Sequence, residues 1–186
     1  GLPLPFSVPP GFRVEEAASG FSLPVSVAFV PNPGPLPDDP LYYVSELYGR
    51  IRVVDRSGGV GTFASDLLNF TPNGVFPGSG EEGLIGLAVD PEDPRFLYAT
   101  LVYRDPSDTG AHPLRNKIVR FRSDDGGKTA AASIDLLLMP GDPTEFSHQV
   151  QSVTVGPDGK LYVTVGDGLI DFRTARSDDS FLGKVL

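Results

Sequence analysis

The sequence predicts an all-β protein, a β-propeller built of four-stranded antiparallel blades. Three eight-residue segments share one pattern, with apolar side chains at alternate positions and a closing proline: PVSVAFVP (24–31), LIGLAVDP (84–91) and VQSVTVGP (150–157). Alternation with period two is typical of strands. The 22 glycines and 19 prolines are typical of short strands joined by many turns. No helical period extends beyond two turns.

After each of these segments, further strands follow in the same order. A strand with a tyrosine in register comes second, then a third strand, and the first two units add a fourth apolar stretch: 42–46, 50–55 and 61–68; 97–101, 117–122 and 133–140; 161–165 and 182–186. A four-stranded unit that recurs about every 60 residues is the signature of a propeller blade. The alternative is a β-sandwich or barrel with chance similarity between its hairpins.

The repeat predicts a single domain over residues 1–186, the N-terminal part of a propeller. Its blade-like units cover about 21–70, 83–140 and 149–186, so about three blades are present. A propeller needs about four to eight blades to close its ring. We therefore expect a further C-terminal part, or self-association with another copy, to complete it. Residues 11–19 alternate like a strand and could close the last blade.

Charge and composition narrow the classes of partner. The net charge is −9, which argues against nucleic acid because a phosphate backbone would be repelled. No apolar run approaches the roughly 18 residues of a membrane-spanning helix. There is no signal-peptide pattern, so we expect that any secretory signal has been removed. The absence of cysteine excludes disulfides, thiolate metal sites and cysteine nucleophiles.

Several motifs, in order along the chain, resemble the soluble quinoprotein glucose/sorbosone dehydrogenase family. They are FRVEEAASGFSLPVSVAFVP, GEEGLIGLAVDPEDPRFLYATLVYRD, NKIVRFRSDD, HQVQSVTVGPDGKLYVTVGDG and LGKVL. The Gly-Pro-Asp-Gly hairpin alone is weak evidence for this family, because many propellers contain it. A histidine eight residues before that hairpin, with the other motifs in the right order, is more specific. The resemblance implies a six-bladed propeller that oxidises sugars or polyols with pyrroloquinoline quinone (PQQ) and calcium, and passes electrons to an acceptor.

The resemblance also assigns residues. It places the catalytic general base at His148, which would take a proton from the sugar's anomeric hydroxyl as hydride moves to the quinone. Imidazole suits this role because histidine side chains titrate near neutral pH. Glu81 and Gln149 would bind cofactor or orient substrate, and Asp167 could support a loop or a cation. The family implies a periplasmic or extracellular location, with most cofactor and calcium ligands outside these residues.

Other interpretations of the same residues stay open. The two glycines of the family motif are here Val150 and Gln151, which would also suit a non-catalytic propeller that binds a protein or a glycan. A metal-dependent propeller lactonase is a third possibility, which would need carboxylate ligands such as Glu81 and Asp167 to converge on the axis. His148 alone could be a structural loop histidine, and we expect His112 to be exposed to solvent.

Overall fold

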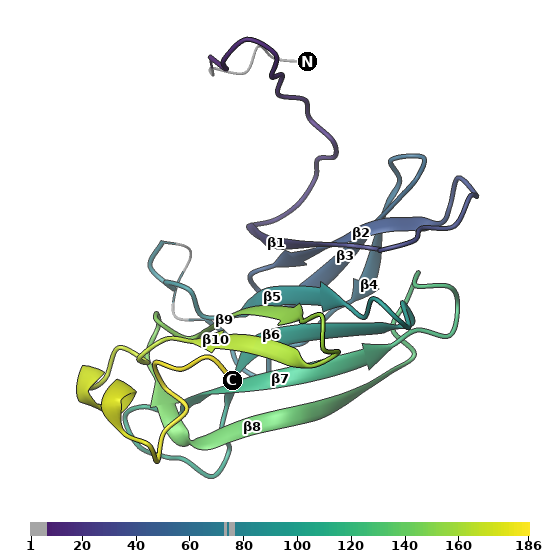
Figure 1. Cartoon of the computed structure of the whole chain (residues 1–186). Helices are drawn as coiled ribbons and strands as arrows, with labels where there is room; N and C mark the ends of the chain where they lie inside the picture. Colours follow the sequence, from purple (N-terminus) through teal and green to yellow (C-terminus); the bar gives the residue numbers. More distant parts are fainter. Residues whose placement is uncertain (1–6, 73, 75–76) are drawn as a thin grey trace.

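The computed structural model describes residues 7–72, 74 and 77–186 and contains three antiparallel sheets that lie side by side (Figure 1). The elements are β1 (Pro24–Phe29), β2 (Pro40–Glu46), β3 (Arg50–Asp55), β4 (Val60–Ala64), β5 (Leu84–Val89), β6 (Phe96–Arg104), β7 (Leu114–Arg122), β8 (Ala132–Thr144), β9 (Val150–Val155), β10 (Leu161–Val165) and a 3₁₀ helix, η1 (Phe172–Arg176). The strand orders are β1-β2-β3-β4, β5-β6-β7-β8 and β10-β9. The all-β class and its four-stranded antiparallel units are therefore confirmed.

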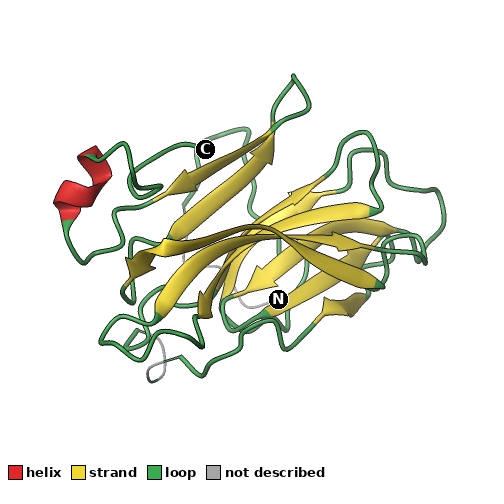
Figure 2. Cartoon of the chain, turned by 90° about the horizontal axis from the view of Figure 1, so that it is seen from below, coloured by secondary structure: helices red, strands yellow, loops and turns green. Residues whose placement is uncertain are grey.

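The first strand of each unit lies on the inside of the arc. Strand β1 packs beside β5, and β5 packs beside β9. These three strands line a groove of about 360 Å³. The 3₁₀ helix lies at the periphery, away from the sheets (Figure 2). Among the described residues, no helix has the length and apolarity needed to cross a membrane.

A first core joins the first and second sheets. The ring of Tyr43 packs edge-on against Phe63, with centroids 5.0 Å apart, and Phe63 packs edge-on against Phe121 at 6.2 Å. The Tyr43 hydroxyl donates a 2.8 Å hydrogen bond to the carbonyl of Gly127, in the loop between β7 and β8. An aromatic side chain with one polar end thus fixes both the packing and the distance between the two sheets.

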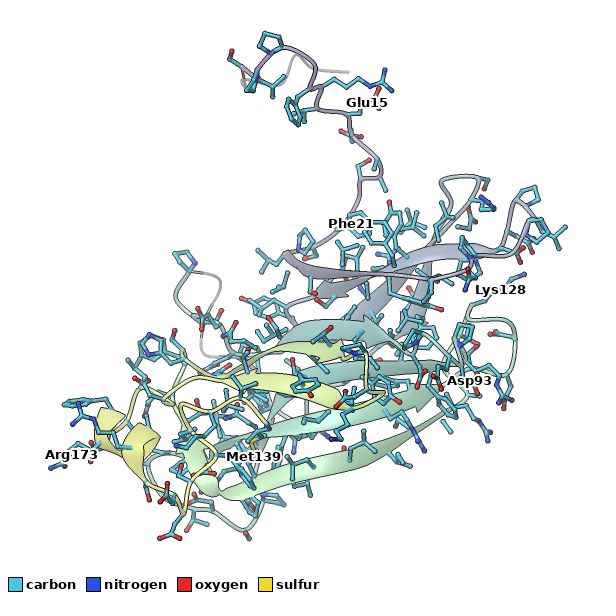
Figure 3. The ribbon with its side chains drawn as sticks, viewed as in Figure 1. Glu15, Phe21, Asp93, Lys128, Met139 and Arg173 are labelled. Atoms are coloured by element: carbon cyan, nitrogen blue, oxygen red, sulfur yellow. The ribbon has the colours of Figure 1, made fainter. Side chains whose placement is uncertain are left out.

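A second core joins the second and third sheets. Met139 is fully buried there among the side chains of Tyr98, Ile118 and Val163 (Figure 3). Alternate residues of β6 therefore face different cores, with Leu97 on the side of the first sheet and Tyr98 on the side of the third. Because both faces of β6 are covered, the strand is almost entirely apolar, as expected for a doubly buried strand.

Two of the tyrosines in register, Tyr43 and Tyr98, face the next sheet along the chain. Tyr43 and Tyr98 are buried in the two cores, whereas Tyr162 is 40% exposed. The Tyr162 ring lies beside Gly156, and its hydroxyl donates to the Asp158 carboxylate at 3.0 Å. At the opposite end of the arc, Val27 and Phe29 of β1 are 50% and 70% exposed. Both ends of the arc thus present apolar side chains of the kind that the interior blades bury.

Three expected strands differ from the structure. The fourth stretch of the first unit ends at Ala64 rather than residue 68, because Asp66 has a positive φ of 56° and breaks the pairing. Residues 182–186 form only one bridge, between Val185 and Thr164, with a few backbone hydrogen bonds beside it. Residues 11–19 form no strand, and this part of the chain extends away from the sheets (Figure 1). Its role in closing a blade stays a prediction.

Candidate functional site

His148 lies in a five-residue segment, 145–149, that connects β8 to β9. Its backbone N–H donates to the Glu81 carboxylate at 3.0 Å, and its carbonyl accepts from the backbone N–H of Gly168 at 2.9 Å. Its φ of 57° lies in the left-handed region, which is uncommon outside glycine and needs support from surrounding contacts. Two distant parts of the chain therefore fix the direction of this side chain.

The imidazole of His148 is paired with a carboxylate. Its Nδ1 lies 2.8 Å from Oδ1 of Asp167, and the His148 side chain is 51% exposed. An ionised carboxylate can only accept, so Nδ1 carries the proton and the neutral ring presents an unprotonated Nε2. Among the described residues, none forms a hydrogen bond with Nε2. The site therefore presents a proton acceptor to solvent on a ring whose tautomer is fixed.

The Gly-Asp-Gly sequence at 166–168 makes this pairing possible. A Cβ atom on Gly166 would collide with the backbone of His148, so only glycine allows the two segments to lie this close. Asp167 also accepts the backbone N–H of Leu169 at 3.1 Å. The hydrogen bond from His148, followed by that from Leu169, lowers the pKa of Asp167 below its ordinary value. The carboxylate is thus kept in the ionised form that its partner requires.

Glu81 lies beside the same histidine. Besides the His148 backbone, its Oε2 accepts from the side-chain amide of Gln151 at 3.3 Å, and its own N–H donates to the Phe146 carbonyl at 2.7 Å. Its side chain stays exposed. The structure therefore brings together three of the predicted residues, His148, Asp167 and Glu81, although Glu81 lies 67 residues from His148 in the sequence.

Gln149, the fourth predicted residue, is placed differently. It is fully buried, and its Nε2 donates a 2.5 Å hydrogen bond to the carbonyl of Glu145. Its Oε1 has no hydrogen-bond partner among the described residues, and the same holds for the nearby Nδ2 of Asn116. Gln149 thus supports the segment from beneath, at a point where its amide faces the interior and not the exposed side of His148.

The backbone at the two residues that replace the family's glycines, Val150 and Gln151, makes close contacts with neighbouring strands. Val150 is buried and donates its N–H to Asn116 Oδ1 at 2.9 Å. The carbonyl of Gln151 accepts a 2.5 Å hydrogen bond from Thr100, and a Cβ on Gly86 would collide with that carbonyl. The close backbone approach is therefore between β5 and β9, with Gly86 providing the space.

A second pairing near the segment was not predicted from the sequence. His112 is 44% exposed in its side chain, but its Nδ1 forms an ion pair with the carboxylate of Glu145. The expectation that His112 is exposed to solvent is confirmed, although the side chain also contacts Glu145. No local pattern could have indicated the pair, because the two residues are far apart in the sequence and both lie in irregular segments.

The described residues include no group of three or more histidine or acidic side chains arranged to hold a metal ion. Asp167, the candidate from the sequence, is engaged by His148 and Leu169. A role for Asp167 toward a cation stays a prediction that no contact in the described structure supports.

Comparison with known proteins identifies relatives of this chain. The family model described as "Glucose / Sorbosone dehydrogenase" matches residues 21–186. The chain is 30% identical over 135 residues to quinoprotein glucose dehydrogenase B of Acinetobacter calcoaceticus, an alignment that covers 70% of this chain and 27% of that protein. The family match therefore includes the sheets of the first two units and the segment that carries His148.

Solved structures show the same architecture. A Thermus thermophilus protein assigned as an oxidoreductase (glucose dehydrogenase) is 32% identical, with a TM-score of 0.70 over 95% of this chain. The PQQ-bound aldose sugar dehydrogenase of Streptomyces coelicolor is 26% identical, with a TM-score of 0.67 over 93% of it. The chain spans 46% of the length of each of these two structures. The sheets are thus part of a propeller, and the chain belongs to the glucose/sorbosone dehydrogenase family.

Proposed function

We propose that the protein containing this chain is a PQQ-dependent oxidoreductase of a sugar or another polyol, with His148 as its general base. The observation that carries the proposal is the pairing of His148 with Asp167, which makes Nε2 the proton-accepting nitrogen of the neutral ring on a half-exposed side chain. Membership of the family and the PQQ-bound structure of a relative support the choice of cofactor.

In this proposal the chain's own residues handle the proton. Nε2 of His148 accepts the proton of the hydroxyl on the carbon that is oxidised, and the resulting imidazolium is stabilised by the Asp167 carboxylate beside Nδ1. A bound quinone supplies the redox chemistry by taking the hydride, which amino-acid side chains cannot do. The same carboxylate favours return of the ring to its starting tautomer when the proton is released.

Glu81 and Gln149 have different parts in the proposal. The Glu81 carboxylate is exposed next to His148 and can accept a hydrogen bond from a second hydroxyl of the substrate. Gln149 acts from within the fold by holding the segment, since its amide is buried. A quinone with carboxylate groups needs cationic partners, and among the described residues no Lys or Arg pairs with Glu81 or Asp167. We therefore expect those partners outside this chain.

The remaining parts of the proposal rest on the family. Calcium would assist cofactor binding through ligands outside these residues, and an acceptor would reoxidise the quinone. We expect a periplasmic or extracellular location, where soluble sugars are available. The exposed apolar ends of the arc, with Phe29 at one and Tyr162 at the other, would be covered by further blades or by a second copy.

The test uses the full-length natural protein, whatever residues it carries beyond these 186. Purified protein is supplied with PQQ and calcium, and reduction of an artificial electron acceptor is followed over a panel of aldoses and polyols. We expect turnover with at least one sugar, and a loss of roughly 100-fold or more in kcat for His148→Ala. Lys128→Ala is the control, because Lys128 pairs with Asp38 on exposed loops and does not contact the site.

Failure of every sugar to reduce the acceptor would overturn the proposal, as would an unchanged kcat in His148→Ala. Two other functions would then be tested on the same protein. Sugar binding without turnover would favour a non-catalytic glycan-binding propeller, and metal-dependent hydrolysis of lactones would favour a lactonase.

A further inference from the structure

The segment that carries His148 is held at its N-terminal end by a side-chain contact that has no part in the proposed chemistry. Glu145 is its first residue, directly after β8. The Glu145 carboxylate forms an ion pair with Nδ1 of His112, in the loop between β6 and β7. The side chains of His112 and Glu145 are 44% and 32% exposed. An exposed pair of this kind adds little to global stability, so its location decides whether it matters.

The backbone of Glu145 links this pair to the candidate base. Its N–H donates to the carbonyl of Gly168 at 2.9 Å, and the N–H of Gly168 donates to the carbonyl of His148 at 2.9 Å. The Glu145 carbonyl accepts a 2.5 Å hydrogen bond from the Gln149 side chain. Glu145 is therefore connected both to the residue after His148 and to the residue after Asp167. A shift of Glu145 would move both partners of the His148–Asp167 pair.

His112 is itself held in place, so it can act as an anchor. Its carbonyl accepts a 2.6 Å hydrogen bond from Nη1 of Arg115, a β7 side chain that is almost completely buried. The same guanidinium donates to the Pro140 carbonyl at 2.8 Å and to the Asp108 carboxylate at 2.5 Å. Arg115 thus joins the β6–β7 loop to β8, the strand that leads into Glu145. A planar guanidinium with several fixed donors is well suited to this task.

The surroundings of the His112–Glu145 pair explain why the loss of either side chain should change the conformation of the 145–149 segment. The pair borders a polar cavity of about 230 Å³ whose lining includes Glu82, Arg104 and Thr144 as well as His112 and Glu145. Without His112, the Glu145 carboxylate could turn into this space. The left-handed φ of His148 would then lose one of the constraints that maintain it.

We propose that His112 and Glu145 are positioning residues, which hold the 145–149 segment so that His148 and Asp167 meet at hydrogen-bonding distance. As an effect on turnover, this inference rests on the proposed function. As an effect on the geometry of the segment, it can be measured without any substrate.

The experiment compares His112→Ala and Glu145→Gln with the unmodified full-length protein, and uses Lys128→Ala as the matched control. Lys128 also forms an ion pair between two loops of neighbouring sheets, but with Asp38. It lies on the opposite side of the molecule from the η1 helix, where Arg173 is labelled (Figure 3). Glu145→Gln removes the charge of the carboxylate without changing the size of the side chain, so it stays informative if His112→Ala does not fold.

The first readout is amide hydrogen exchange, because it needs no catalysis. We expect the N–H groups of Glu145, His148 and Gly168 to exchange about fivefold faster or more in both variants, with no change in Lys128→Ala. The second is the NMR resonance of the Nδ1 proton of His148, which should shift or broaden as the hydrogen bond to Asp167 weakens. If the His112–Glu145 pair did not position the segment, its removal would change neither the amide exchange rates nor the His148 resonance.

The third readout is turnover. We expect kcat to fall about three- to tenfold while KM changes less, since misplacement of a base affects the transition state more than binding. If the unmodified protein oxidises no sugar, the proposed function fails and the exchange and NMR results decide the inference alone. Unchanged exchange and an unchanged His148 resonance in both variants would overturn it, whatever the activity.

Discussion

The ring Nδ1 of His148 and the Oδ1 of Asp167 lie 2.8 Å apart, although 19 positions separate the two residues in the sequence. The contact depends on Gly166, since any larger residue there would collide with the His148 backbone. It also lowers the pKa of Asp167. A glycine, a carboxylate and an imidazole thus form one unit, in which the carboxylate sets the tautomer of the neutral ring.

The first prediction is that Asp167→Asn lowers kcat by roughly 10- to 100-fold. An amide can donate to Nδ1 as well as accept, so the ring can place its proton on Nε2 and lose its basic nitrogen there. Steady-state kinetics of the full-length protein measure the effect, and KM should change less than kcat. Asp171→Asn is the control, because Asp171 caps η1 and, among the described residues, bonds only with that helix turn. Equal losses in the two variants would contradict a specific role for Asp167.

Much of the fold could be predicted from the sequence because its signals are local. Alternation and turn residues predicted ten strands close to their observed positions, since each signal lies within one hairpin. The last strand, 182–186, was overestimated, because its pairing depends on neighbours and not on its own pattern. The described structure has a bridge of Val185 to Thr164 and a few backbone hydrogen bonds there, but no full strand.

The site was predictable only in part, because it is assembled from long-range contacts. The resemblance indicated His148, Glu81 and Asp167, but not that Asp167 would pair with the histidine. It also gave no sign that Gln149 would be buried. The ion pair of His112 joins two irregular segments. Local sequence patterns carry no information about such pairs, which depend on how two neighbouring sheets pack.

The second prediction concerns the interface between the first two sheets. Tyr43→Phe should lower the free energy of unfolding by about 1–2 kcal/mol, because the buried Gly127 carbonyl loses its 2.8 Å hydrogen bond. Urea denaturation measures the change. Tyr162→Phe, the equivalent change in the third sheet, removes an exposed hydrogen bond to Asp158 and should cost less than about 0.5 kcal/mol. Similar losses in both variants would show that the inter-sheet bond contributes nothing of its own.

The third prediction concerns the approach of β5 to β9. Gly86→Ala should destabilise the protein by about 1–3 kcal/mol, since its methyl group would collide with the Gln151 carbonyl and crowd the Thr100 hydroxyl. Gly141→Ala is a matched control within β8, where an added Cβ has no atom within 4 Å. The midpoint temperatures of thermal unfolding, measured for both variants, give the comparison. A stable Gly86→Ala protein would mean that the third sheet can move outward at little cost.

The fourth prediction uses the turn between β7 and β8, which bears the Gly127 carbonyl that binds Tyr43. Partial burial disfavours the charge of Asp125, but hydrogen bonds from the Thr129 hydroxyl and N–H, the Ser123 hydroxyl and the Lys128 N–H outweigh it. Together they lower the pKa of Asp125 from 3.8 to about 2. The ionised form is therefore favoured by the folded state.

The sign of the resulting pH dependence follows from linkage. A carboxyl group with a lowered pKa in the folded state contributes stability above its unfolded pKa of 3.8, and this contribution is lost as the pH falls through about 2. Asp125→Asn should thus be less stable than the unmodified protein at pH 7, by about 1 kcal/mol, and the difference should shrink between pH 4 and pH 2. Urea denaturation over this range measures it. Asp124→Asn, which removes an exposed ion pair with Arg122, should show a difference near zero at pH 7. If the Asp125→Asn difference stayed constant down to pH 2, the charge of Asp125 would not be what stabilises the turn.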